Sequence, residues 1–131
     1  MAHRYDSHFT PPFPRLPVAI SAPEHPASAV LSGLIDTGAD ATLAPLEHLL
    51  AADAVELYRA RLRSHWGELR SVSVYLVDLV VDGHVLPGVE VVGDELTNDV
   101  LLGRNVLNRL RLVLDGPASE VDILSSRPRR R

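Results

Sequence analysis

The chain has 131 residues, of which 46% are hydrophobic, a proportion that allows one domain with a buried core. It contains no cysteine, which excludes disulfides, thiolate metal sites and a cysteine nucleophile. The formal net charge is −4, and every Lys-or-Arg position is arginine, which we interpret as a bias of genome composition. No apolar run reaches the length of a membrane span and no signal-peptide pattern opens the chain, so we expect a soluble cytoplasmic protein with no membrane partner.

The composition divides the chain into three parts. Residues 1–14 are rich in proline and predict a flexible, irregular arm. The histidines of this arm, His3 and His8, have no further ligand types close by, and we expect no metal site there. Residues 15–125 carry the folded domain. Residues 126–131 form a basic, disordered tail, for which a nucleic-acid contact is the alternative; because the rest of the domain is acidic, we expect no nucleic-acid partner.

The patterns in the domain predict short strands with little helix. Residues 15–20 alternate apolar and other side chains as a half-buried strand does, and 29–35 predict a second strand. Pro45 suits the start of one short helical turn over 45–50. Further strand signals and turns follow, and together they predict an all-β, barrel-like domain: strands over 55–81 with a hairpin tip at 64–69, a turn at Asp82-Gly83, strands at 85–92 and 99–103, a short helix at 104–109, and a hairpin of 111–114 with 121–124.

One stretch carries a chemical signal, namely Leu34-Ile35-Asp36-Thr37-Gly38-Ala39-Asp40-Ala41-Thr42. A strand that ends in two apolar residues delivers Asp36 to a tight loop, where Gly38 allows close approach of the backbone. A carboxylate at the buried end of a strand is costly unless it has partners or a chemical role. The alternative is an ordinary turn in which Asp36 caps its own backbone.

This stretch resembles the active-site loop of retropepsin-like aspartic proteases, the retroviral type. A second stretch, Asp99-Val100-Leu101-Leu102-Gly103-Arg104-Asn105-Val106-Leu107, resembles the same family, in which two apolar residues and a glycine precede a short helix. The resemblance covers roughly residues 16 to 124. It implies a single-domain acid-protease barrel with one short C-terminal helix, and we expect a bacterial, stand-alone member.

The chain holds one Asp-Thr-Gly sequence, whereas carboxylate-based peptide hydrolysis needs two carboxylates close enough to share a proton. If the chain is an aspartic endopeptidase, its partner must therefore be a second copy of itself, with Asp36 supplied by each subunit of a symmetric homodimer. The resemblance implies a peptide or protein substrate and no cofactor.

The resemblance also implies roles for other residues. Thr37 would brace the two loops across the dimer axis, and Gly38 would let the backbone pass close to the carboxylates. Ala39 and Asp40 would lie beside the substrate, and Asp40 and Arg104 match an ion pair near the dimer interface. Leu101 would line the substrate groove, Gly103 would pack beneath the loop, and Trp66 and Gly67 would close over the substrate as a flap tip. The terminal strands would add to the dimer contact.

Three alternatives remain open at this point. Trp66 could belong to an ordinary hairpin turn, and Arg104 could be a surface arginine at a helix end. The whole domain could be a catalytically inactive peptide-binding or dimerisation module, because a fold does not determine a function.

Position 39 is alanine, which offers no hydroxyl to stabilise a charged dyad, so we expect maximal activity at weakly acidic to neutral pH.

Overall fold

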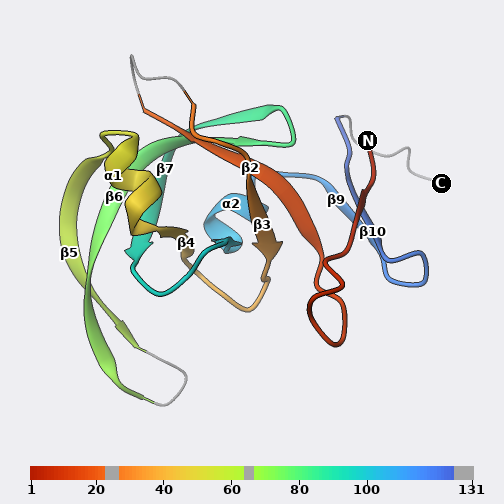
Figure 1. Cartoon of the computed structure of the whole chain (residues 1–131), viewed down its shortest axis with the longest axis horizontal. Coiled ribbons are helices and arrows are strands. Elements are labelled where there is room, and N and C mark those ends of the chain that lie inside the picture. The colour runs from red at the N-terminus through yellow and green to blue at the C-terminus, as the bar shows by residue number, and fades with distance from the viewer. Residues whose placement is uncertain (23–26, 64–66, 126–131) are drawn as a thin grey trace.

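The computed structural model describes residues 1–22, 27–63 and 67–125. The centre of the expected hairpin tip, including Trp66, and the basic tail at 126–131 lie outside these described residues. The chain forms a small β-barrel with two short helices in the described ranges and a separate small sheet at one side (Figure 1). The expected all-β fold is confirmed.

Six strands close the barrel. They are neighbours in the order β2, β3, β8, β4, β7, β6, and a further pairing of β2 with β6 completes the ring. A seventh strand, β5, is added to β6 outside the ring and has no second neighbour among the described strands. The bounds are β2 Arg15–Ser21, β3 Leu31–Ile35, β4 Thr42–Pro45, β5 Val55–Arg63, β6 Leu69–Val81, β7 His84–Asp94 and β8 Val100–Leu102.

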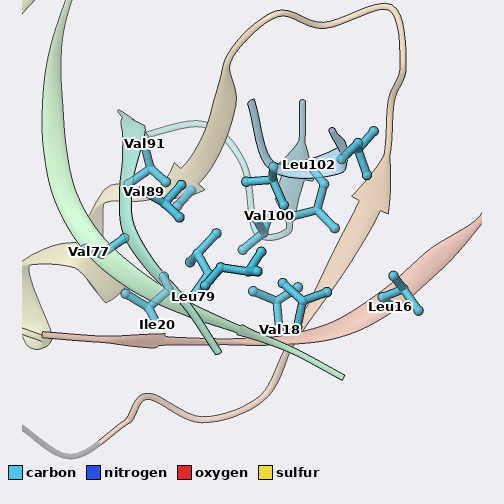
Figure 2. Packing of buried hydrophobic residues seen from close by; sticks show 14 of the residues in the cluster. Leu16, Val18, Ile20, Val77, Leu79, Val89, Val91, Val100 and Leu102 are labelled. Atoms are coloured by element: carbon cyan, nitrogen blue, oxygen red, sulfur yellow. The ribbon is translucent and has the colours of Figure 1, made fainter. Parts of the chain in front are cut away.

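The alternation of side chains along the strands fills the barrel. In β2, the side chains of Leu16, Val18 and Ile20 are fully buried, while the residues between them are partly exposed, as expected from their period of two. Figure 2 shows Val18 and Ile20 near Leu79 of β6, with Leu16 further along β2, and all of these residues belong to one buried cluster with Val100 of β8. Burial of these apolar side chains is the main favourable contribution to folding of this domain.

The turn between β6 and β7 follows directly from its two residues. Asp82 has φ 47° and Gly83 has φ 80°, so both adopt left-handed backbone conformations. This is the two-residue hairpin turn whose twist matches that of the strands, and it joins Val81 to His84 as opposite neighbours. The expected turn at Asp82-Gly83 is present.

Two short helices in the described residues pack against the strands of the barrel. Helix α1 (Leu46–Ala51) begins after Pro45 and buries Leu49, and α2 (Arg104–Leu107) buries Val106 and Leu107. The second helix ends two residues earlier than the expected 104–109. Neither helix, nor any other in the described residues, is long and apolar enough to cross a membrane.

The ends of the chain form a second sheet in the order β1, β10, β9, where β1 is His3–Arg4, β9 is Leu112–Asp115 and β10 is Glu120–Ile123. The expectation of an irregular arm therefore needs correction for its first residues. The N-terminal strand is ordered because it satisfies the open backbone edge of β10, and His3 Nε2 lies 2.8 Å from Asp82 Oδ1 in the β6–β7 turn. Asp6 and Phe13 also exchange backbone hydrogen bonds within this segment.

We predict that Leu79→Ala lowers the free energy of unfolding by about 2–5 kcal/mol, because it removes a fully buried side chain and leaves a cavity. Urea unfolding followed by circular dichroism measures this change. Leu96→Ala is the matched control, since Leu96 is 80% exposed and its truncation should leave stability nearly unchanged. A loss below about 1 kcal/mol for Leu79→Ala would contradict the packing described here.

Candidate active site

The loop that carries Asp36 leaves the barrel where two parallel strands end side by side. Strands β3 and β8 pair in parallel, with Ile35 opposite Leu102. The next residue of each strand, Asp36 and Gly103, therefore emerges at the same place. The backbone N–H of Asp36 donates to the carbonyl of Leu102 at 3.1 Å, which extends the pairing by one step.

The Asp36 carboxylate is positioned by the backbone of its own loop. Gly38 N donates to Asp36 Oδ1 at 2.9 Å, and Ala39 N donates to the Asp36 carbonyl at 3.2 Å. A Cβ atom at position 38 would lie 3.2 Å from Asp36 Oδ1, so glycine leaves room around this oxygen. Asp36 is partly exposed and forms no ion pair within the described parts of the chain. Its second carboxylate oxygen has no hydrogen-bond partner among the described residues.

Gly103 lies directly beneath the loop. A Cβ atom at this position would overlap the backbone carbonyl of Ala41 and would approach the carbonyl of Ala39 to 3.1 Å. The next residue, Arg104, donates its backbone N–H to the same Ala39 carbonyl at 2.8 Å. Position 103 therefore requires glycine on steric grounds, and the start of α2 is bonded to the loop above it.

The buried hydroxyl of Thr42 connects Gly103 and α2 to strand β7. Thr42 is fully buried, and among the described residues it is the one polar side chain in that class. Its hydroxyl donates to Asn105 Oδ1 at 2.7 Å and accepts from Gly103 N at 3.1 Å. The Asn105 amide in turn donates to the Glu90 carbonyl on β7 at 2.9 Å. Loop, α2 and β7 are thereby joined through satisfied hydrogen bonds, as buried polar groups require.

The Arg104 guanidinium braces the loop in a way that differs from the expected ion pair. Arg104 Nη1 donates to the Thr37 carbonyl at 2.9 Å, and within the described residues Arg104 and Asp40 do not form an ion pair. The side chain reaches back across the loop to a carbonyl at its tip, while the exposed Asp40 carboxylate borders the neighbouring groove. The backbone at Thr37 is therefore fixed from below.

A groove of about 310 Å³ lies between the loop and the β5–β6–β7 part of the sheet. Tyr58 donates its hydroxyl to Glu90 Oε1 at 2.6 Å across the groove, and this bond to a carboxylate raises the pKa of Tyr58. A smaller, apolar pocket of about 80 Å³ adjoins Leu43. The groove is lined by Asp40, Ala41, Tyr58, Ala60, Arg61, Leu62, Val74, Glu90, Val92 and Asn105, and the pocket by Leu43, Leu62, Arg70, Val72, Val92, Gly93 and Asp94.

The remaining expected site residues are less closely joined to the loop. Leu101 is partly exposed and pairs with Leu34 and Leu43, and it is not among the side chains that line the groove. Gly67 has φ 85° at the end of the β5–β6 hairpin and has open space around it. Trp66 lies outside the described residues.

Sequence reasoning assigned no role to Thr42, Asn105, Tyr58 or Glu90. Thr42 and Asn105 stand inside the two quoted motifs, and a hydroxyl in a short apolar strand was the signal that could have identified Thr42. Tyr58 and Glu90 come from separate strands, and only the folded structure brings them together.

Comparison with solved structures identifies the fold. The chain is similar to the simian foamy virus (mac) protease, with a TM-score of 0.54, 20% identity, and coverage of 72% of this chain and 91% of that one. It is also similar to the retroviral protease-like domain of Ddi1 from Leishmania major, with a TM-score of 0.57, 14% identity and coverage of 87% and 90%. The fold is therefore that of the retropepsin-like proteases.

A third similar structure is a foamy viral protease–reverse transcriptase in complex with an RNA/DNA hybrid, with a TM-score of 0.59 and 21% identity. The match covers 76% of this chain but only 12% of that much longer one. No protein-family profile matches the sequence, and a search of curated proteins found no match.

We predict that Thr42→Val destabilises the domain by about 1–3 kcal/mol, because it leaves Gly103 N and Asn105 Oδ1 without their buried partner. Thr42→Ser is the control, since it keeps the hydroxyl and loses one methyl group. The free energies of unfolding in urea compare the two variants. Equal stability of Thr42→Val and the wild type would show that this hydroxyl does not join the loop to α2.

Proposed function

We propose that this chain is an aspartic endopeptidase that acts as a homodimer. The observation that carries the proposal is the placement of Asp36 at the start of a braced loop, with one carboxylate oxygen bonded to Gly38 N and the other without a hydrogen-bond partner among the described residues, on a retropepsin-like fold. The neighbouring groove supports it, because its mixture of apolar and polar lining suits a peptide.

The need for a second subunit follows from the chemistry of peptide hydrolysis by carboxylates. One carboxylate takes a proton from a water molecule whose oxygen attacks the scissile carbonyl carbon, while a protonated carboxyl donates to the carbonyl oxygen. Collapse of the resulting tetrahedral intermediate breaks the C–N bond: the carboxyl that took the proton from water gives it to the leaving nitrogen, and the other carboxylate recovers its proton from a hydroxyl of the intermediate as the carbonyl re-forms. One chain offers a single Asp-Thr-Gly loop. Asp36 of the partner subunit would supply the other carboxylate across a two-fold axis.

The loop residues have roles consistent with this arrangement. Thr37 and Gly38 would stand beside the axis, where the Arg104 bond to the Thr37 carbonyl limits movement of the tip. Ala39 and Asp40 would contact the substrate backbone at the edge of the groove. Trp66 and Gly67 would cover the substrate and exclude water. No cofactor enters this mechanism.

An inactive peptide-binding module on the same fold is the second candidate. The bond from Gly38 N to Asp36 Oδ1 is also the bond that an ordinary aspartate turn makes, and it would serve a structural role equally well. The two candidates share the groove and differ in whether bound peptides are cut.

We predict that purified protein cleaves members of a diverse peptide library and that Asp36→Asn loses at least about 100-fold in rate, because the variant has no base for the water. Mass spectrometry of the products measures the rates. Glu47→Gln, which changes an exposed carboxyl on α1, is the matched control and should cleave as the wild type does. The wild-type rate should rise faster than linearly with protein concentration, since the site forms only in the dimer.

Binding of library peptides without cleavage would favour the binding module. Equal cleavage by the wild type and Asp36→Asn would assign the activity to a contaminant and leave Asp36 without a catalytic role.

We further predict that cleavage is fastest at weakly acidic to neutral pH and that Ala39→Ser moves the maximum to lower pH. A serine hydroxyl beside the dyad would stabilise its charged form, whereas alanine cannot donate a hydrogen bond. Rates measured between about pH 3 and pH 8 in buffers of constant ionic strength test this expectation. A wild-type maximum at or below about pH 3 would contradict it.

A further inference from the structure

Strand β5 is the open edge of the large sheet. Its nine residues, Val55–Arg63, pair with β6 on one side, and no described strand pairs with the other side. Such an edge presents unpaired backbone donors and acceptors to solvent and can accept a further strand. In Figure 1 this strand lies at the outer margin of the barrel, away from the terminal sheet.

Three arginines occur at alternate positions of this edge, at Arg59, Arg61 and Arg63. They stand opposite Ser73, Ser71 and Leu69 of β6, whereas the buried Val72 and Val74 stand opposite Ala60 and Tyr58. Because side chains alternate along a strand, the three arginines leave β5 on the same side, and the side chain of Arg61 also reaches the groove beside the catalytic loop. All three are exposed.

These positive charges are not neutralised within the described parts of the chain. Arg59 donates to the uncharged Ser71 hydroxyl, with its Nη2 at 3.2 Å. Arg61 and Arg63 form no hydrogen bond or ion pair there. The whole chain carries a formal charge of −4, so this arginine row is a basic feature on an acidic protein.

The same face continues into a polar cleft of about 210 Å³ between the hairpin and α1. Arg59, Ser71 and Ser73 contribute to its lining, and Glu95 is the one carboxylate among the lining residues. The cleft therefore extends the surface with hydroxyl and guanidinium donors, which suit a ligand that brings hydrogen-bond acceptors.

The positive charges on β5 distinguish between the molecules that could bind to this strand. Antiparallel pairing of β5 with a second copy of itself, centred on Arg61, would place Arg59 opposite the partner's Arg63 and repel the two strands. A single-stranded nucleic acid is bound through aromatic side chains on which its bases stack, and among the described residues the arginine face exposes none, because Tyr75 is buried. An extended polypeptide with acidic side chains satisfies both the backbone edge and the arginines.

We propose that the β5 edge binds an extended acidic segment of another protein, with Asp or Glu at alternate positions matched to Arg59, Arg61 and Arg63. Carboxylates two residues apart on a strand are about 6.6 Å apart, the same repeat as the arginines. The segment would add to the sheet through backbone hydrogen bonds. The inference rests on the sheet edge and its charges and not on the activity of Asp36, although on the proposed peptidase such a segment would direct which proteins are cut.

Fluorescence anisotropy tests this proposal in the Asp36→Asn protein, so that no probe is cleaved. The probe is a labelled peptide of four Glu-Val repeats, compared at about 50 mM salt with Gln-Val repeats and with a peptide of the same composition whose glutamates are contiguous. We expect the Glu-Val peptide to bind at least about fivefold more tightly than both comparison peptides, because only its charges match in sign and spacing.

The double substitution Arg59→Gln and Arg63→Gln should weaken binding of the Glu-Val peptide by about fivefold or more. These two side chains do not line the groove beside the catalytic loop, so the groove stays unchanged. Arg111→Gln is the matched control, since it removes an exposed arginine from the segment before β9 and should leave the affinity unchanged. Circular dichroism establishes that each variant is folded.

Three results would overturn the proposal: no binding of the Glu-Val peptide up to millimolar concentration, equal affinity for the Gln-Val peptide, or equal affinity of the double variant and its parent. Tighter binding of an oligothymidine of equal charge would also overturn it and reassign the arginine row to nucleic acid. Because the assay does not involve catalysis, its outcome is independent of whether the wild type cleaves peptides.

Discussion

The close approach of Gly103 to the carbonyl of Ala41 is the constraint on which the candidate site depends. The missing side chain lets the end of β8 lie beneath the loop that follows β3, and the backbone of Arg104 then bonds to Ala39. The Thr42 hydroxyl, buried at the same point, fastens the loop to α2 and β7. A single carboxylate thus stands on a loop whose conformation is determined by packing from below, which is the preorganisation that a reacting group needs.

Features that depend on local sequence could be predicted. The alternation in β2, the left-handed turn at Asp82-Gly83 and the all-β class each follow from neighbouring residues and their backbone preferences. Asp36 was also placed correctly at the end of a buried strand, because two apolar residues precede a glycine-containing loop. These signals need no knowledge of which strands pair.

Features that depend on distant pairing could not be predicted. The N-terminal strand pairs with β10, more than a hundred positions later, and neither segment alone indicates this. Arg104 bonds to the Thr37 carbonyl and not to Asp40, because the choice depends on how loop and helix are stacked. The groove combines Tyr58 and Glu90 from two strands, each of which would be an ordinary polar residue in isolation. The sign of a residue's charge and its expected exposure do not show which distant residue it will contact.

Strand β6 pairs with different strands along its length. Its last residues, from Asp78 to Val81, pair with β2 and close the ring, whereas residues 69–73 pair with β5 alone among the described strands. An irregularity in register between Val77 and Leu79 separates the two portions. Substitutions in the outer portion therefore alter the surface of the hairpin without opening the ring. The end of the hairpin is a part of this molecule in which side chains can change at low risk to closure of the barrel.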